Sequence, residues 1–267
     1  MRVGYFQYCP EFGAPAHNLD KIQDTLDGIN ADIIVLPELA LTGYFFEDRK
    51  EVKNFAEDVV DSKTVNTLSA FCKANDFHLV IGIAERQNGK LYNSALVIGP
   101  FGSIHIYRKI HLFNTEKEYF DPGDTPLGIV SIRGAKVGVM ICFDWAFPEV
   151  ARVLALQGAD IICHPSNLVL TYCQKTMLSR SLENSVYSIT ANRTGREIRP
   201  HSELLFTGQS QIVGPNGEII ACSDSEQEEV LVEDINLALA RDKSITANND
   251  LFGDRRSEFY NSLFERK

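Results

Sequence analysis

The sequence predicts an α/β fold in which two mixed sheets pack together and are flanked by helices. Short apolar runs rich in β-branched and aromatic residues recur along the 267-residue chain, each bounded by Gly, Pro, Asn or Asp, which is typical of strands. Between several of these runs, apolar residues recur at spacings of three and four, which is typical of helices. Strands that alternate with helices indicate an α/β fold whose helices cover the faces of the sheets.

Each element follows from one of these two patterns or from a turn signal. The strand pattern identifies nine segments, at residues 3–8, 33–36, 79–84, 93–98, 136–141, 161–164, 187–191, 210–213 and 230–234. The helical spacing identifies four more, at residues 19–29, 65–72, 150–157 and 174–186. Two tight turns, at residues 99–102 and 214–217, supply Gly where a positive φ is needed and predict antiparallel hairpins. So many strands do not fit one open sheet of this length, and two packed sheets are expected.

The composition excludes several classes of protein. Hydrophobic residues make up 44% and charged residues 23% of the chain, which excludes a disordered, fibrous or coiled-coil protein. The 36 acidic and 26 basic side chains give a net charge of −10, so we expect neither nucleic acid nor membrane as a partner. Without a linker or a repeat, residues 1–267 should form one domain. Six scattered cysteines and no signal segment predict reduced thiols and a cytoplasmic location.

The first candidate for chemistry is a carboxylate that follows a strand. The run at residues 33–36 leads into Pro37, which cannot donate to a ladder, and then into Glu38 among apolar neighbours. Burial would raise the pKa of Glu38, as a general acid–base catalyst requires. The alternative is a surface glutamate at the end of a strand.

The second candidate is a basic segment. Residues 107–112 alternate basic and apolar side chains, which would place Lys109 and His111 on one strand face. A lysine in a site of low dielectric constant can stabilise a developing oxyanion. The alternative is a charged edge strand that discourages aggregation.

The third candidate is a cysteine at a strand-to-helix turn. A buried strand ends at Cys142 and a helix is predicted a few residues later. Backbone N–H groups at such a turn can bind an oxyanion and lower the pKa of the thiol. The remaining cysteines are interpreted as small buried hydrophobes: Cys9, Cys72, Cys163, Cys173 and Cys222.

Together these segments resemble the nitrilase (carbon–nitrogen hydrolase) superfamily. That family has a strand-Pro-Glu segment, an Arg-Lys-x-His-Leu segment and a Cys-x-Asp/Glu…Phe-Pro-Glu segment. All three occur here in that order, as Leu36-Pro37-Glu38, Arg108-Lys109-Ile110-His111-Leu112 and Cys142-Phe143-Asp144-Trp145-Ala146-Phe147-Pro148-Glu149. Further matches at residues 91–95, 121–124, 158–161, 164–167 and 190–195 extend the resemblance over nearly the whole chain.

The resemblance implies a catalytic triad. Cys142 would attack the carbon of an amide or nitrile, and Glu38 would act as the general base and acid. Lys109 and the backbone N–H of Phe143 would hold the oxyanion. The family uses a second glutamate after the lysine, and the surrounding pattern selects Glu116 over Glu118. We interpret four further residues as substrate-binding: Tyr44, Asn93, Trp145 and Asn167.

The resemblance also implies a fold and an assembly. The family fold is a four-layer α-β-β-α sandwich, and subunits usually pair into a homodimer or a larger homo-oligomer. The tail at about residues 240–267 would pack at the dimer interface, because apolar residues such as Phe252 and Phe259 lie among charges. The alternative is a tail folded back on its own subunit. No cofactor and no metal are expected.

Several functions remain open at this point. The favoured one is hydrolysis of a small aliphatic amide, and the same triad serves N-carbamoyl compounds and nitriles; Arg193 and Arg196 are candidates to recognise a substrate carboxylate. The alternative enzyme class is a Cys–His thiol hydrolase, in which His111 or His164 would act as the base. A metal site formed by Cys163, His164 and Cys173 is disfavoured, because neighbours on a strand point to opposite faces. A catalytically inactive binding protein is the alternative outside enzymes.

Overall fold

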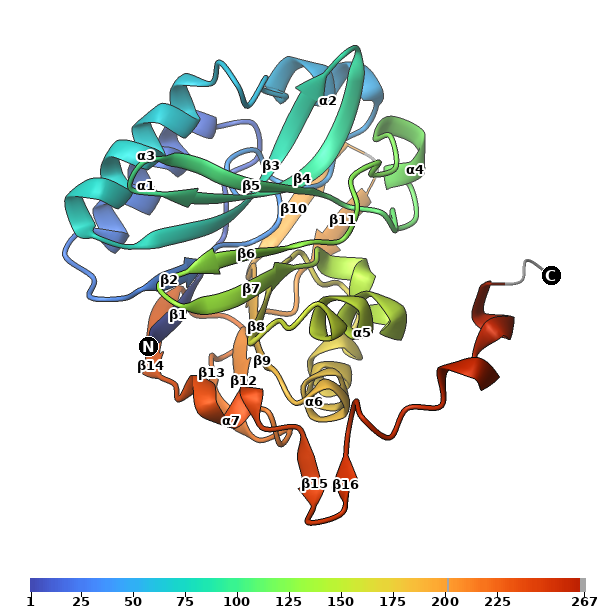
Figure 1. The fold of residues 1–267 in the computed structure, drawn as a ribbon. Helices are drawn as coiled ribbons and strands as arrows, with labels where there is room; N and C mark the ends of the chain where they lie inside the picture. The colour runs from blue at the N-terminus through green and yellow to red at the C-terminus, as the bar shows by residue number, and fades with distance from the viewer. Residues whose placement is uncertain (201, 265–267) are drawn as a thin grey trace.

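Two six-stranded sheets form the centre of the molecule (Figure 1). The computed structural model describes residues 1–200 and 202–264. The first sheet has the order β14-β1-β2-β3-β4-β5, with bounds Glu229–Asp234, Arg2–Gln7, Ile33–Val35, His78–Gln87, Lys90–Gly99 and Gly102–Arg108. The second has the order β13-β12-β9-β8-β7-β6, with bounds Ile219–Cys222, Gln211–Val213, Tyr187–Asn192, Ile161–Ser166, Ala135–Val139 and Ile129–Ile132.

Both sheets are mixed, as the two hairpin turns predict. In the first sheet β1, β2 and β3 run parallel, whereas β14, β4 and β5 pair antiparallel with their neighbours. In the second sheet β7, β8 and β9 run parallel, and β6, β12 and β13 are antiparallel. The predicted hairpins are those that join β4 to β5 and β12 to β13.

Helices cover the outer face of each sheet and complete four layers. Helices α1 (Pro15–Leu26) and α3 (Lys63–Asn75) pack on the first sheet, and α5 (Pro148–Leu156) and α6 (Cys173–Asn184) pack on the second. All four lie where the apolar spacing predicts them. The predicted α-β-β-α sandwich is therefore confirmed.

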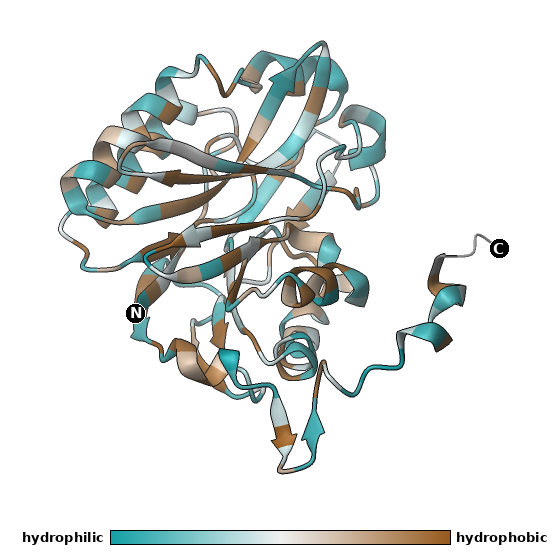
Figure 2. Cartoon of the chain, viewed as in Figure 1, coloured by the Kyte–Doolittle hydropathy of each residue, from teal (hydrophilic) through white to brown (hydrophobic). Residues whose placement is uncertain are grey.

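The strand segments are continuously apolar because both faces of each sheet are buried, one against the other sheet and one against the helices. Along β2, Ile33 and Val35 point between the sheets, whereas Ile34 points toward the helices that cover the first sheet. Figure 2 shows the hydrophobic residues concentrated along the central strands. Strands buried on both faces give nearly continuous apolar runs, which is why the sequence pattern identifies them.

Several short elements carry no such signal. They are α2 (Arg49–Phe55), α4 (Glu116–Tyr119), α7 (Leu237–Arg241) and the hairpin of β10 (Arg196–Arg199) and β11 (Ser202–Leu205). The predicted strand at residues 107–112 is wrong beyond Arg108, where β5 ends. Lys109 donates its N–H to the Asn93 carbonyl while its own carbonyl accepts from Gly123. The chain therefore leaves the sheet after Lys109, and His111 shares no strand face with it.

The C-terminal tail leaves the sandwich. After α7 it forms a small hairpin of β15 (Ser244–Thr246) and β16 (Asn249–Asp250), then extends away from the body (Figure 1). The Phe252 ring lies 5.3 Å from the Arg152 guanidinium and 5.1 Å from the Lys243 ammonium, and it packs against the main core. Phe259 and Leu263 are 68% and 64% exposed. The end of the predicted tail, residues 265–267, lies outside the described part of the chain.

No helix in the described residues is both long enough and apolar enough to span a membrane.

The loop after β2 is pressed against the next strand, and one glycine permits this contact. The Gly82 N–H donates to the Pro37 carbonyl at 3.2 Å, and the Gly82 carbonyl accepts from Ala40 at 2.9 Å. A Cβ on Gly82 would lie 2.5 Å from the Cα of Glu38. Only a residue without a side chain lets the Glu38 backbone approach β3 this closely.

We expect Gly82→Ala to lower the free energy of unfolding by about 1–3 kcal/mol, because the added methyl collides with backbone. The measurement is urea unfolding followed by circular dichroism. Gly128→Ala is the control, since its nearest contact would be an ordinary 3.6 Å to His105. Equal losses in the two variants would contradict the tight packing of the Glu38 loop.

Candidate active site

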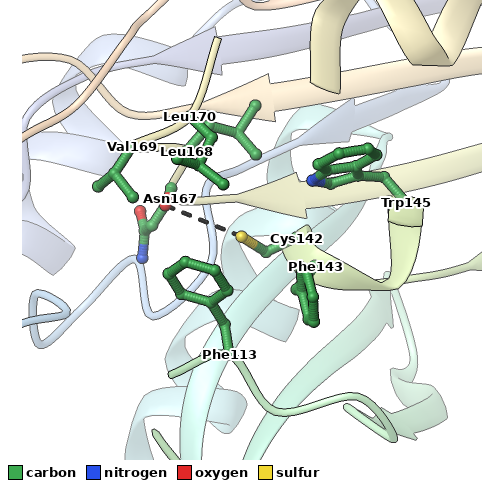
Figure 3. A pocket seen from close by; sticks show the side chains of 8 residues that line it. All are labelled: Phe113, Cys142, Phe143, Trp145, Asn167, Leu168, Val169 and Leu170. Atoms are coloured by element: carbon green, nitrogen blue, oxygen red, sulfur yellow. Dashed lines mark hydrogen bonds between the residues drawn. The ribbon is translucent and has the colours of Figure 1, made fainter. Parts of the chain in front are cut away.

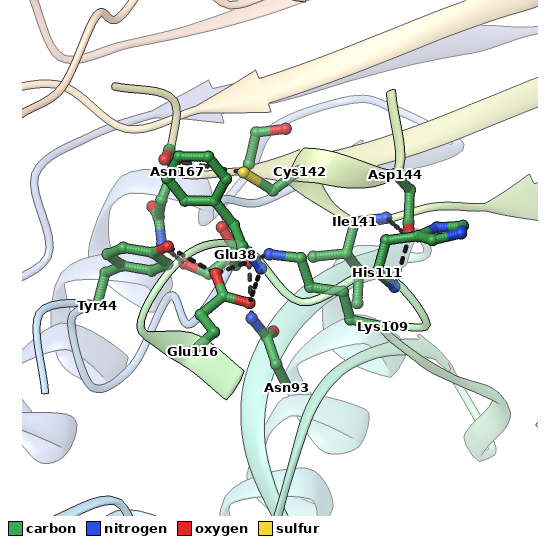
Figure 4. Close-up of polar contacts among 12 residues, drawn as sticks. Glu38, Tyr44, Asn93, Lys109, His111, Glu116, Ile141, Cys142, Asp144 and Asn167 are labelled. Atoms are coloured by element: carbon green, nitrogen blue, oxygen red, sulfur yellow. Dashed lines mark hydrogen bonds and ion pairs between the residues drawn. The ribbon is translucent and has the colours of Figure 1, made fainter. Parts of the chain in front are cut away.

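Four side chains from four separate segments meet at one end of the two sheets (Figure 4). Glu38 follows β2, Lys109 follows β5, Glu116 begins α4 and Cys142 follows β7. Glu38 and Glu116 are both 0% exposed, and the other two are buried. The structure therefore brings together all four residues for which the family resemblance implies catalytic roles, and it leaves Glu118 exposed at the surface.

Lys109 is the centre of this cluster. Its Nζ donates to Glu38 Oε1 at 2.6 Å and to Glu116 Oε1 at 2.8 Å. Glu38 Oε1 also accepts from Asn93 Nδ2 at 2.7 Å, and Glu116 Oε1 accepts from the Tyr44 hydroxyl at 2.6 Å. Two ionised carboxylates and one ammonium would leave one surplus negative charge inside the protein.

One oxygen of Glu38 is left over. Glu38 Oε2 is buried and has no hydrogen-bond partner in the described part of the chain. A buried acceptor without a partner costs free energy, so such an atom in a site is a candidate for a role with a ligand. This oxygen is free to accept a proton.

Burial and the neighbouring charges shift the pKa values of the three groups. Burial raises the pKa of Glu38, and the charge of Lys109 only partly offsets the rise. Burial, followed by the charge of Glu38, raises the pKa of the Cys142 thiol well above its ordinary value. Burial alone would lower the pKa of Lys109, but Glu116 and Glu38 outweigh it and raise that pKa. The expectation of a lowered thiol pKa is thus wrong for the resting site, and the thiol needs a base.

The turn at Cys142 is strained and tied to the lysine segment. Cys142 starts a short 3₁₀ helix, Cys142–Ala146, with a positive φ of 41°. Such a conformation is uncommon for a residue with a side chain and concentrates at functional sites. Asp144 stabilises the turn: its carboxylate accepts from the Ile141 N–H at 2.9 Å, the Tyr107 hydroxyl at 2.7 Å and His111 Nδ1 at 2.8 Å.

A small apolar pocket opens beside the sulfur (Figure 3). Its empty volume is about 240 Å³ when the open solvent at its mouth is included, and its lining residues are Phe113, Cys142, Phe143, Trp145, Asn167, Leu168, Val169 and Leu170. Trp145 and Asn167 were predicted as substrate-binding and do line it. Tyr44 and Asn93 instead bind the two glutamates. Phe113 and the residues after Asn167 were missed, because they lie in loops that carry no periodic pattern.

The sequence and the fold of this chain have counterparts among known proteins. The sequence model of the carbon-nitrogen hydrolase family matches residues 2–243. This chain belongs to that family.

Two relatives illustrate the range of names within the family. A nitrilase from Pyrococcus abyssi is 44% identical over 263 residues, which cover 97% of this chain and 99% of the relative. An N-carbamoylputrescine amidase from Arabidopsis thaliana is 32% identical, with 87% of this chain and 84% of the relative covered.

Solved structures agree with the fold. A carbon-nitrogen hydrolase from Helicobacter pylori G27 superposes with a TM-score of 0.88 at 25% identity, covering 100% of this chain and 98% of the other. An amidase from Nesterenkonia sp. gives 0.80 at 24% identity and supports the fold alone.

In this carbon-nitrogen hydrolase neither histidine near the site reaches the sulfur. The Cys142 Sγ hydrogen bond goes to the Asn167 carbonyl at 3.8 Å. His164 is buried, its pKa is lowered by burial to about 4, and its Nε2 lies 2.9 Å from the carbonyl of Cys142 rather than from Sγ. His111 is held by Asp144 and stacks on Phe147 with ring centroids 3.6 Å apart. This geometry disfavours a Cys–His arrangement.

The described residues contain no group of three His, Cys, Asp or Glu side chains that could hold a metal ion. Arg193 and Arg196, the candidates to recognise a carboxylate, are not among the pocket-lining residues. Arg193 is buried in an ion pair with Glu197, and Arg196 pairs at the surface with Glu203.

If Glu38 is the base, replacing it should remove the reactivity of the Cys142 thiol. We expect Glu38→Gln to slow alkylation of Cys142 by iodoacetamide at pH 7 by about 10²-fold or more, because no histidine in the described part of the chain reaches the sulfur to take its proton instead. His111→Ala and His164→Ala are the controls and should keep at least about a tenth of the parent rate when folded. Peptide mass mapping identifies the alkylated cysteine. An equal loss in a folded histidine variant would contradict the assignment of the base.

Proposed function

We propose that this chain hydrolyses a non-peptide carbon–nitrogen bond of a small aliphatic amide through a thioester on Cys142, with release of ammonia. The observation that carries the proposal is the buried Glu38–Lys109–Glu116 cluster beside a thiol, in which one oxygen of Glu38 has no partner among the described residues. A thiol with a raised pKa needs a neighbouring base, and Glu38, whose own pKa is raised, is suited to take and return a proton.

The first half-reaction forms the thioester. Glu38 Oε2 takes the proton of the Cys142 thiol as the sulfur attacks the carbonyl carbon, and the electron pair of the C=O bond moves to oxygen. Lys109 and the backbone N–H of Phe143 stabilise that oxyanion. Glu38 then gives its proton to the nitrogen, the C–N bond breaks and ammonia leaves.

The second half-reaction regenerates the enzyme. Glu38 takes a proton from a water molecule, which attacks the carbonyl carbon of the thioester. The C–S bond then breaks, the sulfur recovers a proton from Glu38, and a carboxylic acid is released. Glu116 takes no proton in this scheme; it holds Lys109 and helps to position substrate and water.

The pocket supports a small neutral acyl group. Except for Cys142 and Asn167, its lining residues are aromatic or aliphatic and none is charged. A neutral aliphatic amide fits this surface better than a substrate with a free ammonium or carboxylate, which would lose its hydration without a partner. N-carbamoyl amines and aliphatic nitriles are the alternative substrates for the same residues. The relatives include an N-carbamoylputrescine amidase and a nitrilase.

We propose further that residues 1–267 act as one domain within a homodimer or larger homo-oligomer, with the tail at the interface. The exposed Phe259 and Leu263, carried away from the sandwich, support this assembly.

The nucleophile is tested by removing its sulfur. Cys142→Ala should abolish ammonia release from a panel of small amides, with nearly unchanged thermal stability, because the substitution removes little volume and no charge. Ureido acids and dinitriles in the same panel separate the alternative substrates. Activity within about tenfold of the parent, or a variant that unfolds, would overturn the role of Cys142.

The two glutamates are distinguished by the covalent intermediate. Glu116→Gln should accumulate an acyl-enzyme on Cys142 with a small amide, because its loss spares the first step more than the second. Glu38→Gln should accumulate none, since the first step is blocked. Intact-protein mass spectrometry after acid quench measures the adduct, and Glu118→Gln, exposed and outside the cluster, should behave like the parent. An adduct in Glu38→Gln alone would reverse the two roles.

A further inference from the structure

We infer that Glu197, held by the buried Arg193, is a positioning residue that fixes the turn carrying Tyr44, so that the Tyr44 hydroxyl holds Glu116 in place at Lys109. This inference rests on the proposed function and adds to it a part of the chain outside the catalytic cluster. Glu197 lies on β10, in a two-stranded hairpin separate from both large sheets.

The turn at residues 43–45 is built around the Glu197 carboxylate. Glu197 is 4% exposed and accepts from the Tyr44 N–H at 3.0 and 3.1 Å and from the Phe45 N–H at 2.6 Å. Gly43 has a φ of +79°, and a Cβ on it would come within 2.7 Å of Glu197 Oε1. The backbone of this turn therefore closes tightly over the carboxylate, and hydrogen bonds to a charged acceptor are among the stronger ones in proteins.

Arg193 keeps that carboxylate in place. The Arg193 side chain is fully buried, forms an ion pair with Glu197 and donates to the Pro10 carbonyl at 3.2 Å. Its guanidinium lies 4.0 Å from the centre of the Phe206 ring, and that ring packs edge-on against Tyr44. The Arg193–Glu197 pair thus holds Tyr44 in two ways. Glu197 binds its backbone N–H, and Arg193 packs on Phe206, which contacts the Tyr44 ring.

Tyr44 carries this constraint into the site. Its hydroxyl donates to Glu116 Oε1 at 2.6 Å, the same oxygen that accepts from Lys109 at 2.8 Å. Figure 4 shows Tyr44 and Lys109 reaching the Glu116 carboxylate from different directions. Because Lys109 also binds Glu38, the position of Glu116 decides how Lys109 is shared between the two glutamates.

The consequence for proton transfer has a definite sign. Without the Tyr44 hydroxyl, the charge on Glu116 is less compensated; it draws Lys109 away from Glu38 and repels the charged form of Glu38. Both effects raise the pKa of Glu38, so the acid limb of Cys142 reactivity moves to higher pH. The titratable groups that face Glu38 are Lys109, Glu116, Cys142, Tyr44 and Tyr119.

A plain charge effect would have the opposite sign. Glu197→Gln leaves the Arg193 guanidinium without its counter-ion, and an added positive charge favours ionised Glu38. That effect would move the acid limb to lower pH. The direction of the shift therefore separates positioning through Tyr44 from electrostatics acting through space.

The experiment compares Tyr44→Phe, Glu197→Gln and the double variant with the parent. Tyr119→Phe is the matched control, since it removes a buried hydroxyl nearby that bonds to Thr115 at 3.5 Å and not to Glu116. The pH profile of Cys142 alkylation by iodoacetamide needs no knowledge of the substrate. Ammonia release from the best small amide gives kcat and KM.

We expect each single variant to lose about tenfold in kcat with KM changed less than about threefold, and the acid limb to move to higher pH. The kcat of the double variant should be no lower than that of the more impaired single variant, because both changes break the same chain of contacts. Independent losses that multiply, a limb that moves to lower pH in Glu197→Gln, or an equal effect in Tyr119→Phe would each overturn the inference.

Two further outcomes are separated by the design. If Glu197→Gln does not fold because Arg193 is left unpaired, Arg193→Met/Glu197→Gln removes both charges and takes its place in the comparison. If the parent releases no ammonia from any amide while the alkylation limb shifts as described, the proposed function fails and the positioning role stands. If the parent turns over an amide normally and the acid limb is unchanged in every variant, the proposed function stands and the positioning role fails.

Discussion

The rest of the site depends on three buried ionisable groups: Glu38, Lys109 and Glu116. Burying a charge is tolerated only when it is paired and hydrogen-bonded, and here one ammonium serves two carboxylates. The remaining imbalance is carried by neutral donors, Asn93 on Glu38 and Tyr44 on Glu116. Each partner comes from a different segment, so the cluster forms only when both the sheet and its loops are in place.

The lysine is held by its backbone and its neighbours as much as by its charge. Its N–H and carbonyl are both engaged, with Asn93 and Gly123. A Cβ on Gly123 would collide with the Arg108 carbonyl. The Asp-Pro-Gly-Asp segment can therefore approach the backbone of Arg108 this closely only because its third residue is glycine. Arg108 points away from the site, to Glu85 at 2.9 Å and Asp124 at 2.7 Å. These backbone contacts thus fix the point at which the Lys109 side chain leaves the chain, directly after β5.

The sequence predicts what depends on repetition and on motifs, and misses what depends on contacts between loops. The strands around Ile33 and Val139 and the helix at Leu154 are recognisable because long buried elements produce a periodic apolar pattern. Lys109 was placed on a strand that ends one residue earlier, because the alternating pattern continues past the point where Gly123 takes over the hydrogen bonds. Short elements of four or five residues, such as α4, leave too few positions for any period to show.

Site residues divide in the same way. Glu38, Lys109 and Cys142 each stand in a local motif, whereas Phe113 and Leu170 enter the pocket only through the path of their loops. Glu197 has no local signal at all, since its partners Tyr44 and Phe45 lie about 150 positions away in the sequence. Hydrogen bonds of this kind are invisible to spacing and become apparent only with the tertiary structure.

The charge balance around Lys109 also bears on release of the proposed product. The proposed substrate, a neutral amide, would enter an apolar pocket next to two carboxylates and would add no charge. Hydrolysis would convert it to a carboxylic acid, and the ionised form of that acid would be a third negative charge beside a single ammonium. Lys109 is already engaged by both glutamates, and no other cation lines the described pocket. Repulsion between like charges in a site of low dielectric constant would therefore favour release of the ionised product, whereas a neutral substrate would meet no such barrier.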